Sequence, residues 1–327
     1  MLQKILFTML PFITLMLGLL FFSSWVTYHA LLAFGVITQG LSHTIWVGLF
    51  FLPAVLVVSM SLYGLIHNRI LSIIYTVSVS WLPILIYLFL SVVILSIVYF
   101  IGALFGSQIN MFPFALVLVT ISFLATGYGI YNATKIRVNT FEINSPELAP
   151  LWSDKKIILV SDTHLGIVRS QKFMRKVVNL INEQRPDIVL FAGDMIDGPN
   201  FDFVKSLTEL NNLKTEMGIF YTPGNHEAYS RQRESFYKEV VNYTNMLVDK
   251  VVVVNGTQII GLDYKIENKA ETAKRLEACG YKKEMPSIVI MHDPKNMQAL
   301  SDAGASLVVS GHTHLGQFFP INFIVRA

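Results

Sequence analysis

The first 132 residues are almost continuously apolar, and after them short hydrophobic runs alternate with polar stretches. The hydrocarbon core of a bilayer is about 30 Å thick and needs roughly 20 apolar residues per helix. Four such stretches can be delimited, so we predict membrane-spanning helices over Ile5–Trp25, Thr44–Ile66, Val77–Leu104 and Phe112–Tyr131. The apolar run of the third stretch begins as early as Ile70, which leaves three or five spans as alternatives.

From Lys155 onward the pattern is that of an α/β domain, because β-branched runs alternate with amphipathic segments of helical length. We expect strands at Ile157–Val160, Ile188–Phe191, Gly218–Tyr221, Val251–Val254, Ile288–Met291 and Leu307–Val309. We expect helices at Gln171–Gln184, Phe203–Leu213, Glu227–Tyr243 and Ala270–Cys279. The predicted organisation is a transmembrane region over residues 1–132, a polar linker over 133–154 and a soluble domain over 155–327.

Charge divides the chain at the same place. Residues 1–132 contain no Asp or Glu and only two strong bases, Lys4 and Arg69, so the remainder holds 23 of the 25 Lys and Arg (25 minus 2) and all 22 acids. With four spans, these two bases and the pair Lys135 and Arg137 all fall on one side of the membrane, which the positive-inside rule makes the cytoplasmic side. We therefore expect an integral, multi-pass membrane protein with a cytoplasmic soluble domain; a cleaved signal peptide at the N-terminus is the alternative to a retained first helix.

Composition also excludes several functions. The 23 bases and 22 acids of the second half nearly balance, which excludes a strongly basic surface for nucleic acid. Cys279 is the only cysteine, so an intramolecular disulfide cannot form. Within the predicted spans the ionisable residues are confined to edge positions such as His43 and His67, and a transport pathway usually carries buried charges. The apolar helices are thus expected to anchor the chain in the lipid bilayer.

Five short segments in the second half end an expected strand in residues that bind metals. They are Asp162-Thr163-His164, Gly193-Asp194, Gly224-Asn225-His226-Glu227, His292-Asp293 and Gly311-His312-Thr313-His314. Each alone is more typical of an ordinary loop, but function in α/β sheets gathers beyond the carboxyl ends of strands, where all five are expected. Carboxylate, imidazole and amide donors suit Mn, Fe or Zn, and two such cations can activate a shared water and hold phosphoryl oxygens. The pattern predicts a two-metal centre that hydrolyses phosphate esters.

The order D-x-H, G-D, G-N-H-[DE], H and G-H-x-H, from Lys155 to Gln317, resembles the calcineurin-like metallophosphoesterases, and in particular their bacterial membrane-associated branch. The resemblance implies a layered αββα sandwich. It also implies that Asp194 bridges two metal ions, with the remaining ligands divided between them: Asp162, His164 and His314 on one ion, and Asn225, His292 and His312 on the other.

By the same resemblance, His226 stands near the scissile phosphate, where it would stabilise the transition state or protonate the leaving oxygen. Glu227 would orient the imidazole of His226. An equally favoured interpretation makes Glu227 an acid in the first turn of a helix, interacting with the helix dipole.

Two features depart from the pattern of this branch. Leu315 stands where the branch commonly has the first glycine of G-H-T-H-G-G-Q, which would narrow the pocket or add an apolar wall. The chain ends at Ala327, whereas the family continues past this motif with further strands, so a C-terminally incomplete domain is expected.

The sequence thus predicts a membrane-anchored, two-metal-dependent hydrolase of phosphomonoesters or phosphodiesters. Attachment to the bilayer favours a lipid-linked phosphoester, and a soluble nucleotide or phosphoprotein remains open. Candidate phosphate-binding bases are Arg169, Lys172, Arg175, Arg231 and Arg233, which are more typical of solvated helix residues. Two other classes stay open: a non-catalytic membrane sensor or scaffold that uses the same fold, and a transporter with a regulatory hydrolase domain. The sequence does not determine the oligomeric state.

Overall fold

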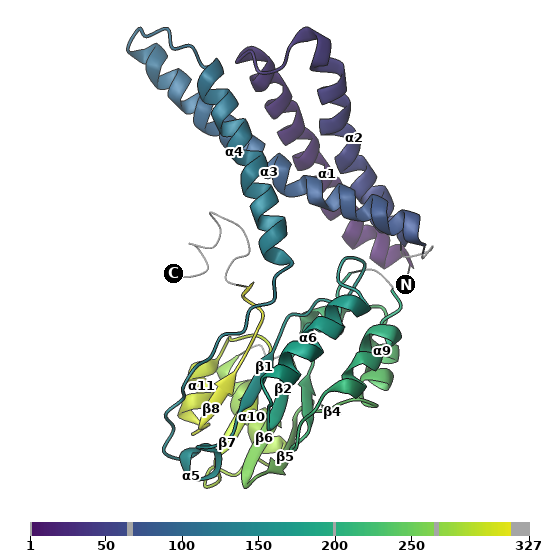
Figure 1. Cartoon of the computed structure of the whole chain (residues 1–327), viewed down its shortest axis with the longest axis vertical. Helices are drawn as coiled ribbons and strands as arrows, with labels where there is room; N and C mark the ends of the chain where they lie inside the picture. The colour runs from purple at the N-terminus through teal and green to yellow at the C-terminus, as the bar shows by residue number, and fades with distance from the viewer. Residues whose placement is uncertain (1, 64–67, 199–200, 265–267, 315–327) are drawn as a thin grey trace. The chain divides into compact units, whose positions relative to one another are not determined.

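The computed structural model describes residues 2–63, 68–198, 201–264 and 268–314. The expectations for Leu315 and for the end of the chain lie outside these residues. The chain divides into two compact units, Met1–Ile136 and Arg137–Ala327, and both are drawn in Figure 1.

The first unit consists, over its described residues, of four long helices: α1 (Leu2–Ala33), α2 (Gln39–Tyr63), α3 (Arg69–Leu104) and α4 (Phe112–Ala133). Each contains a segment long and apolar enough to cross a membrane. The predicted number of long apolar helices is confirmed, but several boundaries differ, and the second helix already starts at Gln39. The first helix continues to Ala33, and the third starts at Arg69 because the side chain of Asn68 accepts the backbone N–H of Leu71 at 2.7 Å and caps the helix there.

Within this unit α3 packs against α1, α2 and α4. Buried hydroxyls link the helices: Ser24 Oγ donates to the carbonyl of Leu49 at 2.8 Å, and Ser91 and Ser122 share a hydrogen bond of 3.0 Å. Small hydroxylated side chains of this kind let apolar helices approach closely and satisfy polar groups away from water. Pro113 lies in the first turn of α4, where its missing N–H interrupts no helical hydrogen bond.

The second unit is built on two four-stranded sheets (Figure 1). The first is wholly parallel, in the order β1 (Ile157–Val160), β2 (Ile188–Ala192), β3 (Ile219–Thr222) and β4 (Asn245–Met246). The second contains β5 (Lys250–Val254), β6 (Thr257–Gly261), β7 (Ser287–Ile290) and β8 (Leu307–Val309), antiparallel between β5 and β6 and parallel thereafter. The predicted α/β architecture is confirmed.

Successive residues of a strand point to opposite faces of the sheet, and this alternation gives the second unit its layers. Ile188 and Leu190 of β2 share one buried cluster with Ile288 and Ile290 of β7, so the two sheets enclose a common core. The intervening residue Val289 turns to the opposite face, where it packs with Leu276 of α10 (Lys269–Ala278) and Leu300 of α11 (Met297–Asp302). On α6 (Gln171–Glu183), the buried residues follow the helical spacing of an amphipathic stripe: Met174, Val177, Val178 and Ile181.

Strand β6 was not anticipated, although it lies between β5 and β7 in the second sheet. A two-residue turn, Asn255-Gly256, joins it to β5, and both turn residues have positive φ, 47° and 71°. An Asn-Gly pair between apolar runs is a strong hairpin signal, so the information was present in the sequence. The two-residue strand β4 was also missed, because its length gives no recognisable period.

Two predicted helices are each divided in two. The segment Glu227–Tyr243 forms α8 (Asn225–Tyr229) and α9 (Arg233–Val240), separated at Ser230, whose backbone is extended. The segment Phe203–Leu213 forms α7 (Val204–Leu207) and a 3-10 helix η1 (Thr208–Asn212).

The expected linker, residues 133–154, contributes α5 (Ala149–Trp152) to the second unit. Trp152 is buried in the core between the sheets, and its indole N–H donates to Thr257 Oγ1 at 2.7 Å. Packing of this unit therefore begins before Lys155.

Candidate metal centre

The five metal-ligand segments follow five parallel-paired strands. Asp162 and His164 come after β1, Asp194 after β2, Asn225 after β3, His292 after β7, and the pair His312 and His314 after β8. Carboxyl ends of parallel strands meet at one edge of a sheet, and the two sheets of this unit bring their edges together. The seven predicted ligands consequently converge, although they span more than 150 positions of the sequence.

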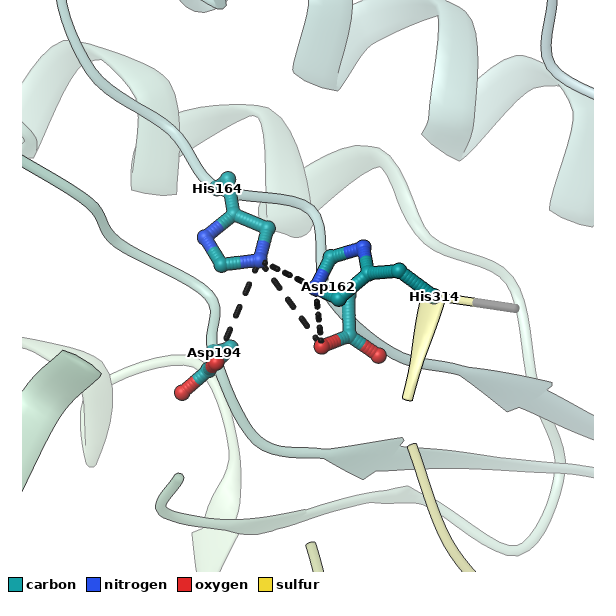
Figure 2. Close-up of side chains that lie close together, drawn as sticks. All are labelled: Asp162, His164, Asp194 and His314. Atoms are coloured by element: carbon teal, nitrogen blue, oxygen red, sulfur yellow. Dashed lines mark hydrogen bonds and ion pairs between the residues drawn. The ribbon is translucent and has the colours of Figure 1, made fainter. Parts of the chain in front are cut away.

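One group comprises Asp162, His164, Asp194 and His314, whose donor atoms all lie within 4.8 Å of one another (Figure 2). His314 Nε2 is 3.1 Å from Asp162 Oδ1 and 3.0 Å from His164 Nε2. His164 Nε2 is also 3.7 Å from Asp162 Oδ1 and 3.9 Å from Asp194 Oδ2. These are the residues that the sequence assigned to one metal ion together with the bridging carboxylate.

A second group comprises Asp194, His292 and His312. His292 Nε2 lies 3.1 Å from Asp194 Oδ2, 3.3 Å from His312 Nδ1 and 3.1 Å from the side-chain oxygen of Asn225. The buried carboxylate of Asp194 belongs to both groups, which is the position that a bridging ligand requires.

The chemistry of these donors fits divalent cations. His292 Nδ1 lies 2.7 Å from the carbonyl of Ala192, a contact in which the ring must donate, so in the neutral ring, the form that binds metal, the lone pair is on Nε2. That lone pair faces an amide oxygen, a carboxylate and the nitrogen of a second imidazole. Acceptors that converge in a buried site repel one another unless protons or a cation lie between them. Oxygen and imidazole donors of this kind suit Mn, Fe or Zn.

The backbone at the ligands adopts an uncommon conformation. Five ligand residues have positive φ, a region that costs most side chains of order 1–3 kcal/mol and persists where the surroundings enforce it. They are Asp162 (56°), His164 (44°), Asp194 (51°), His312 (75°) and His314 (46°). Such strain gathers at functional sites, so the fold holds these side chains in place at some expense in stability.

Glycines allow the ligand loops to approach closely. Gly193 has a φ of 79°, and a Cβ there would lie 2.6 Å from His292 Nδ1. Gly224 does not need positive φ, but a Cβ on it would collide with the carboxylate of Asp194. Both glycines thus allow close approach, and of the two Gly193 alone has a left-handed backbone conformation.

Both acidic ligands of the first group are held in the ionised form. Burial alone would raise the pKa of Asp162, but hydrogen bonds with His164, His314 and Ser161 outweigh it and lower that pKa below its ordinary value. The pKa of Asp194 is likewise lowered: burial opposes ionisation, and the contacts with His292 and His226 favour it. Ionised carboxylates are the form that binds metal.

His226 stands beside both groups without joining either. Its Nε2 is 3.9 Å from Asp194 Oδ2, its ring centroid is 4.6 Å from that of His164, and its backbone N–H donates to Asp194 Oδ1 at 2.9 Å. Its Nδ1 donates to Asp197 Oδ1 at 2.6 Å, which leaves Nε2 toward Asp194. The hydrogen bond with Asp197 raises the pKa of His226 above its ordinary value, although burial opposes the shift.

Sequence reasoning missed Asp197. Its second oxygen is 3.7 Å from His164 Nδ1, so one carboxylate contacts both imidazoles. The available signal was its place in Gly193-Asp194-Met195-Ile196-Asp197, three residues after a ligand in the same loop.

Of the two interpretations of Glu227, the structure supports the acid in the first turn of a helix and not the partner of the His226 ring. Its fully buried carboxylate accepts the backbone N–H groups of Asp194 (3.0 Å), Ile196 (2.8 Å) and Gly224 (2.8 Å). The bond to Gly224 caps the start of α8 from the N3 position, as an acid in the first turn of a helix would do. Asp197, rather than Glu227, contacts the ring of His226; Glu227 supports the backbone of the loop that carries Asp194.

Three of the candidate phosphate-binding bases have other partners. Arg169 donates to the carbonyls of Asp162 and Thr163, Arg175 pairs with Glu209, and Arg233 pairs with its neighbour Glu234. Arg169 is therefore a support of the first ligand loop.

Comparison with known proteins agrees with this geometry. Residues 155–316 match the calcineurin-like phosphoesterase family. This part of the chain is a calcineurin-like phosphoesterase domain. The α/β sheets described above are accordingly those of a metallophosphoesterase domain, and the converging metal donors lie within the matched residues.

Metallophosphoesterases of several organisms are similar to the chain. An "uncharacterized metallophosphoesterase" of Helicobacter pylori strain J99 is 34% identical over 192 residues, which cover 54% of this chain and 50% of that protein. A "transmembrane protein with metallophosphoesterase domain" of Bos taurus is 27% identical over 217 residues, covering 59% and 48% respectively. A Bacillus subtilis "uncharacterized metallophosphoesterase" is 28% identical over 173 residues, covering 50% and 59%. The chain spans about half the length of the curated relatives it matches first.

Proposed function

We propose that this protein is a membrane-embedded phosphoester hydrolase that works with two divalent metal ions. The observation that carries the proposal is the shared carboxylate of Asp194, which belongs to both groups of converging metal donors. Asp162, His164 and His314 would complete one ion site. Asn225, His292 and His312 would complete the other.

In the proposed mechanism, proton donation and the positioning of the metal donors are assigned to residues of the chain. When bound, two such ions supply Lewis acidity and lower the pKa of a water between them. His226 presents Nε2 beside Asp194 and, in its protonated form, would give its proton to the leaving oxygen. Asp197 holds Nδ1 of that ring and favours the protonated form. Glu227 fixes the backbone around Asp194.

The four apolar helices are an argument for a substrate that itself lies in or near a membrane. A domain tethered to a bilayer meets lipid-linked phosphoesters at a raised effective concentration. Placement of the domain in the cytoplasm rests on the basic residues Lys4, Arg69, Lys135 and Arg137, which share one side when four helices span.

The direct test is hydrolysis of a chromogenic phosphodiester by the purified full-length chain in detergent with Mn²⁺. We expect His226→Ala to lower kcat by about 10²–10⁴-fold with metal content unchanged, the usual contribution of a general acid. Asp194→Asn should abolish turnover and reduce bound metal. Asp202→Asn is the matched control, because that carboxylate is exposed and pairs with Lys205.

Equal rates in wild type, His226→Ala and Asp194→Asn would contradict the enzyme proposal and favour a non-catalytic sensor or scaffold. If the wild type is instead faster than both variants, lipid extracts added to the active enzyme, with phosphate release as the readout, would identify the substrate class.

A further inference from the structure

Two tyrosines lie beside the second group of metal donors. Tyr229 ends α8 and Tyr264 follows β6; their ring centroids are 6.0 Å apart with planes at 80°. The ring centroid of Tyr264 is 6.4 Å from that of His292 and 6.4 Å from that of His312. The pair therefore forms an aromatic surface next to this half of the metal centre.

The pair is accessible and does not serve the core. Tyr229 is 71% exposed, whereas a tyrosine that stabilises the fold by packing would be largely buried. Tyr264 is half-buried and links the exposed ring to the histidines. Aromatic side chains together with a few polar groups are what commonly line ligand-binding sites.

The backbone that carries Tyr264 is held by an ion-pair network. The N–H of Asp263 donates to Asp249 Oδ1 at 3.0 Å, and Arg275 of α10 contacts Asp249 Oδ2 at 2.9 Å and Glu271 at 2.6 Å. Arg275 is also 3.9 Å from Asp263. The backbone next to Tyr264 is thus tied to α10, and such preorganisation lowers the entropy lost on binding.

His226 serves the other half of the centre. Its ring contacts that of His164, in the first group of donors, while Tyr264 contacts the rings of the second group. The leaving oxygen must lie within reach of His226 to receive its proton. A substituent near the tyrosines is then a different one, which stays bonded to phosphorus.

We infer that Tyr229 and Tyr264 bind the retained substituent of a phosphodiester, so that the site prefers diesters whose second substituent is planar or apolar. This inference rests on the proposed function and specifies its substrate class. Aromatic rings favour such substituents through stacking and through burial of apolar area.

The test compares two substrates with the same leaving group, bis(p-nitrophenyl) phosphate and methyl p-nitrophenyl phosphate. For full-length protein in detergent with Mn²⁺, we expect Tyr229→Ala and Tyr264→Ala to raise KM for the first about tenfold, near the upper end of what one aromatic contact supplies. KM for the methyl ester should change less than about twofold, since a methyl group stacks weakly. Tyr243→Ala is the control, because its hydroxyl contacts Glu239 on α9.

Tyr264→Phe keeps the ring and should retain most of the preference, and metal content measured for every variant verifies that the centre is intact. Equal rises in KM for both substrates would overturn the inference, as would no rise for either. Failure of the wild-type chain to exceed Asp194→Asn on both substrates would instead overturn the proposed function.

Discussion

The side chains at the metal centre are of two kinds: those that lie among the metal donors, and those that hold these donors in position. Asp194 faces both groups of donors, and three backbone N–H groups around it and in the adjoining loop are bound by the buried carboxylate of Glu227. Asp197 performs the equivalent task for two imidazoles, since it contacts His226 at 2.6 Å and His164 at 3.7 Å. Positions behind the ligands should thus affect turnover without removing metal.

The Asp197–His226 contact leads to a prediction about pH. Asp197 raises the pKa of His226, so Asp197→Asn should lower that pKa and reduce the protonated fraction at neutral pH. With protonated His226 as the acid, the alkaline limb of the kcat/KM profile should move to lower pH, and kcat near pH 7 should fall about 10–100-fold, a part of the usual general-acid contribution. Kinetics of the full-length protein between pH 5 and 9 would measure both effects (about the range over which imidazole titrates).

Bound metal should remain near the wild-type amount in Asp197→Asn. A uniform loss of activity at every pH, without displacement of the limb, would contradict the positioning role. His226→Ala in the Asp197→Asn background should add little further loss if the two residues act as one unit.

Among the elements, the short ones determine how the second unit closes. Helix α5 has only four residues, yet its Trp152 is buried between the sheets and bonded to Thr257 at the start of β6. Asn255, in the turn before β6, donates its side-chain amide to the carbonyl of Leu151 in the same helix at 2.6 Å. These two hydrogen bonds attach the segment before Lys155 to the β5–β6 hairpin.

We expect the contacts between α5 and this hairpin to contribute measurably to the free energy of unfolding. Trp152→Phe and Thr257→Val should each lower the free energy of unfolding by roughly 1–3 kcal/mol, because each leaves one buried polar group without its partner. The double variant should lose less than the sum of the two, since neither unpaired group remains. Pulse proteolysis in urea on the full-length protein in detergent would measure the three values; strict additivity would contradict a direct coupling.

At the scale of the whole molecule, the sequence combines a unit of four apolar helices with a metallophosphoesterase domain. The few basic residues near the ends of these helices then decide the predicted membrane topology. Lys4 lies at the start of α1, Arg69 begins α3, and Lys135 and Arg137 follow α4, so four spans would put all of them on one side. By the positive-inside rule we predict that this side, and the domain that follows α4, face the cytoplasm.

Cysteine labelling would test this topology. In a Cys279→Ser background, Ser107→Cys lies between α3 and α4, and Thr140→Cys lies after α4; both positions are exposed. A membrane-impermeant maleimide should label Ser107→Cys in intact cells and Thr140→Cys only after permeabilisation. The reverse pattern would place the phosphoesterase domain outside the cytoplasm.

Much of this protein follows from local patterns. Hydrophobic length determines the four membrane helices, because the bilayer requires a fixed span, and a period of two or of 3.6 residues indicates most strands and helices. The five ligand segments also followed from the sequence, since ligand chemistry and position after a strand are both local properties. The Asn255-Gly256 turn before β6 carried the same kind of signal and was overlooked.

Other features depend on which distant residues the fold brings together. Asp197 contacts His226, Glu227 contacts the backbone around Asp194, and Tyr264 contacts the rings of His292 and His312, all across loops from different strands. Spacing along the chain does not encode these pairs, because the packing of two sheets sets them. The sequence by itself therefore determined the chemistry of the metal donors, and the tertiary structure decided which residues hold those donors and which surface lies beside them.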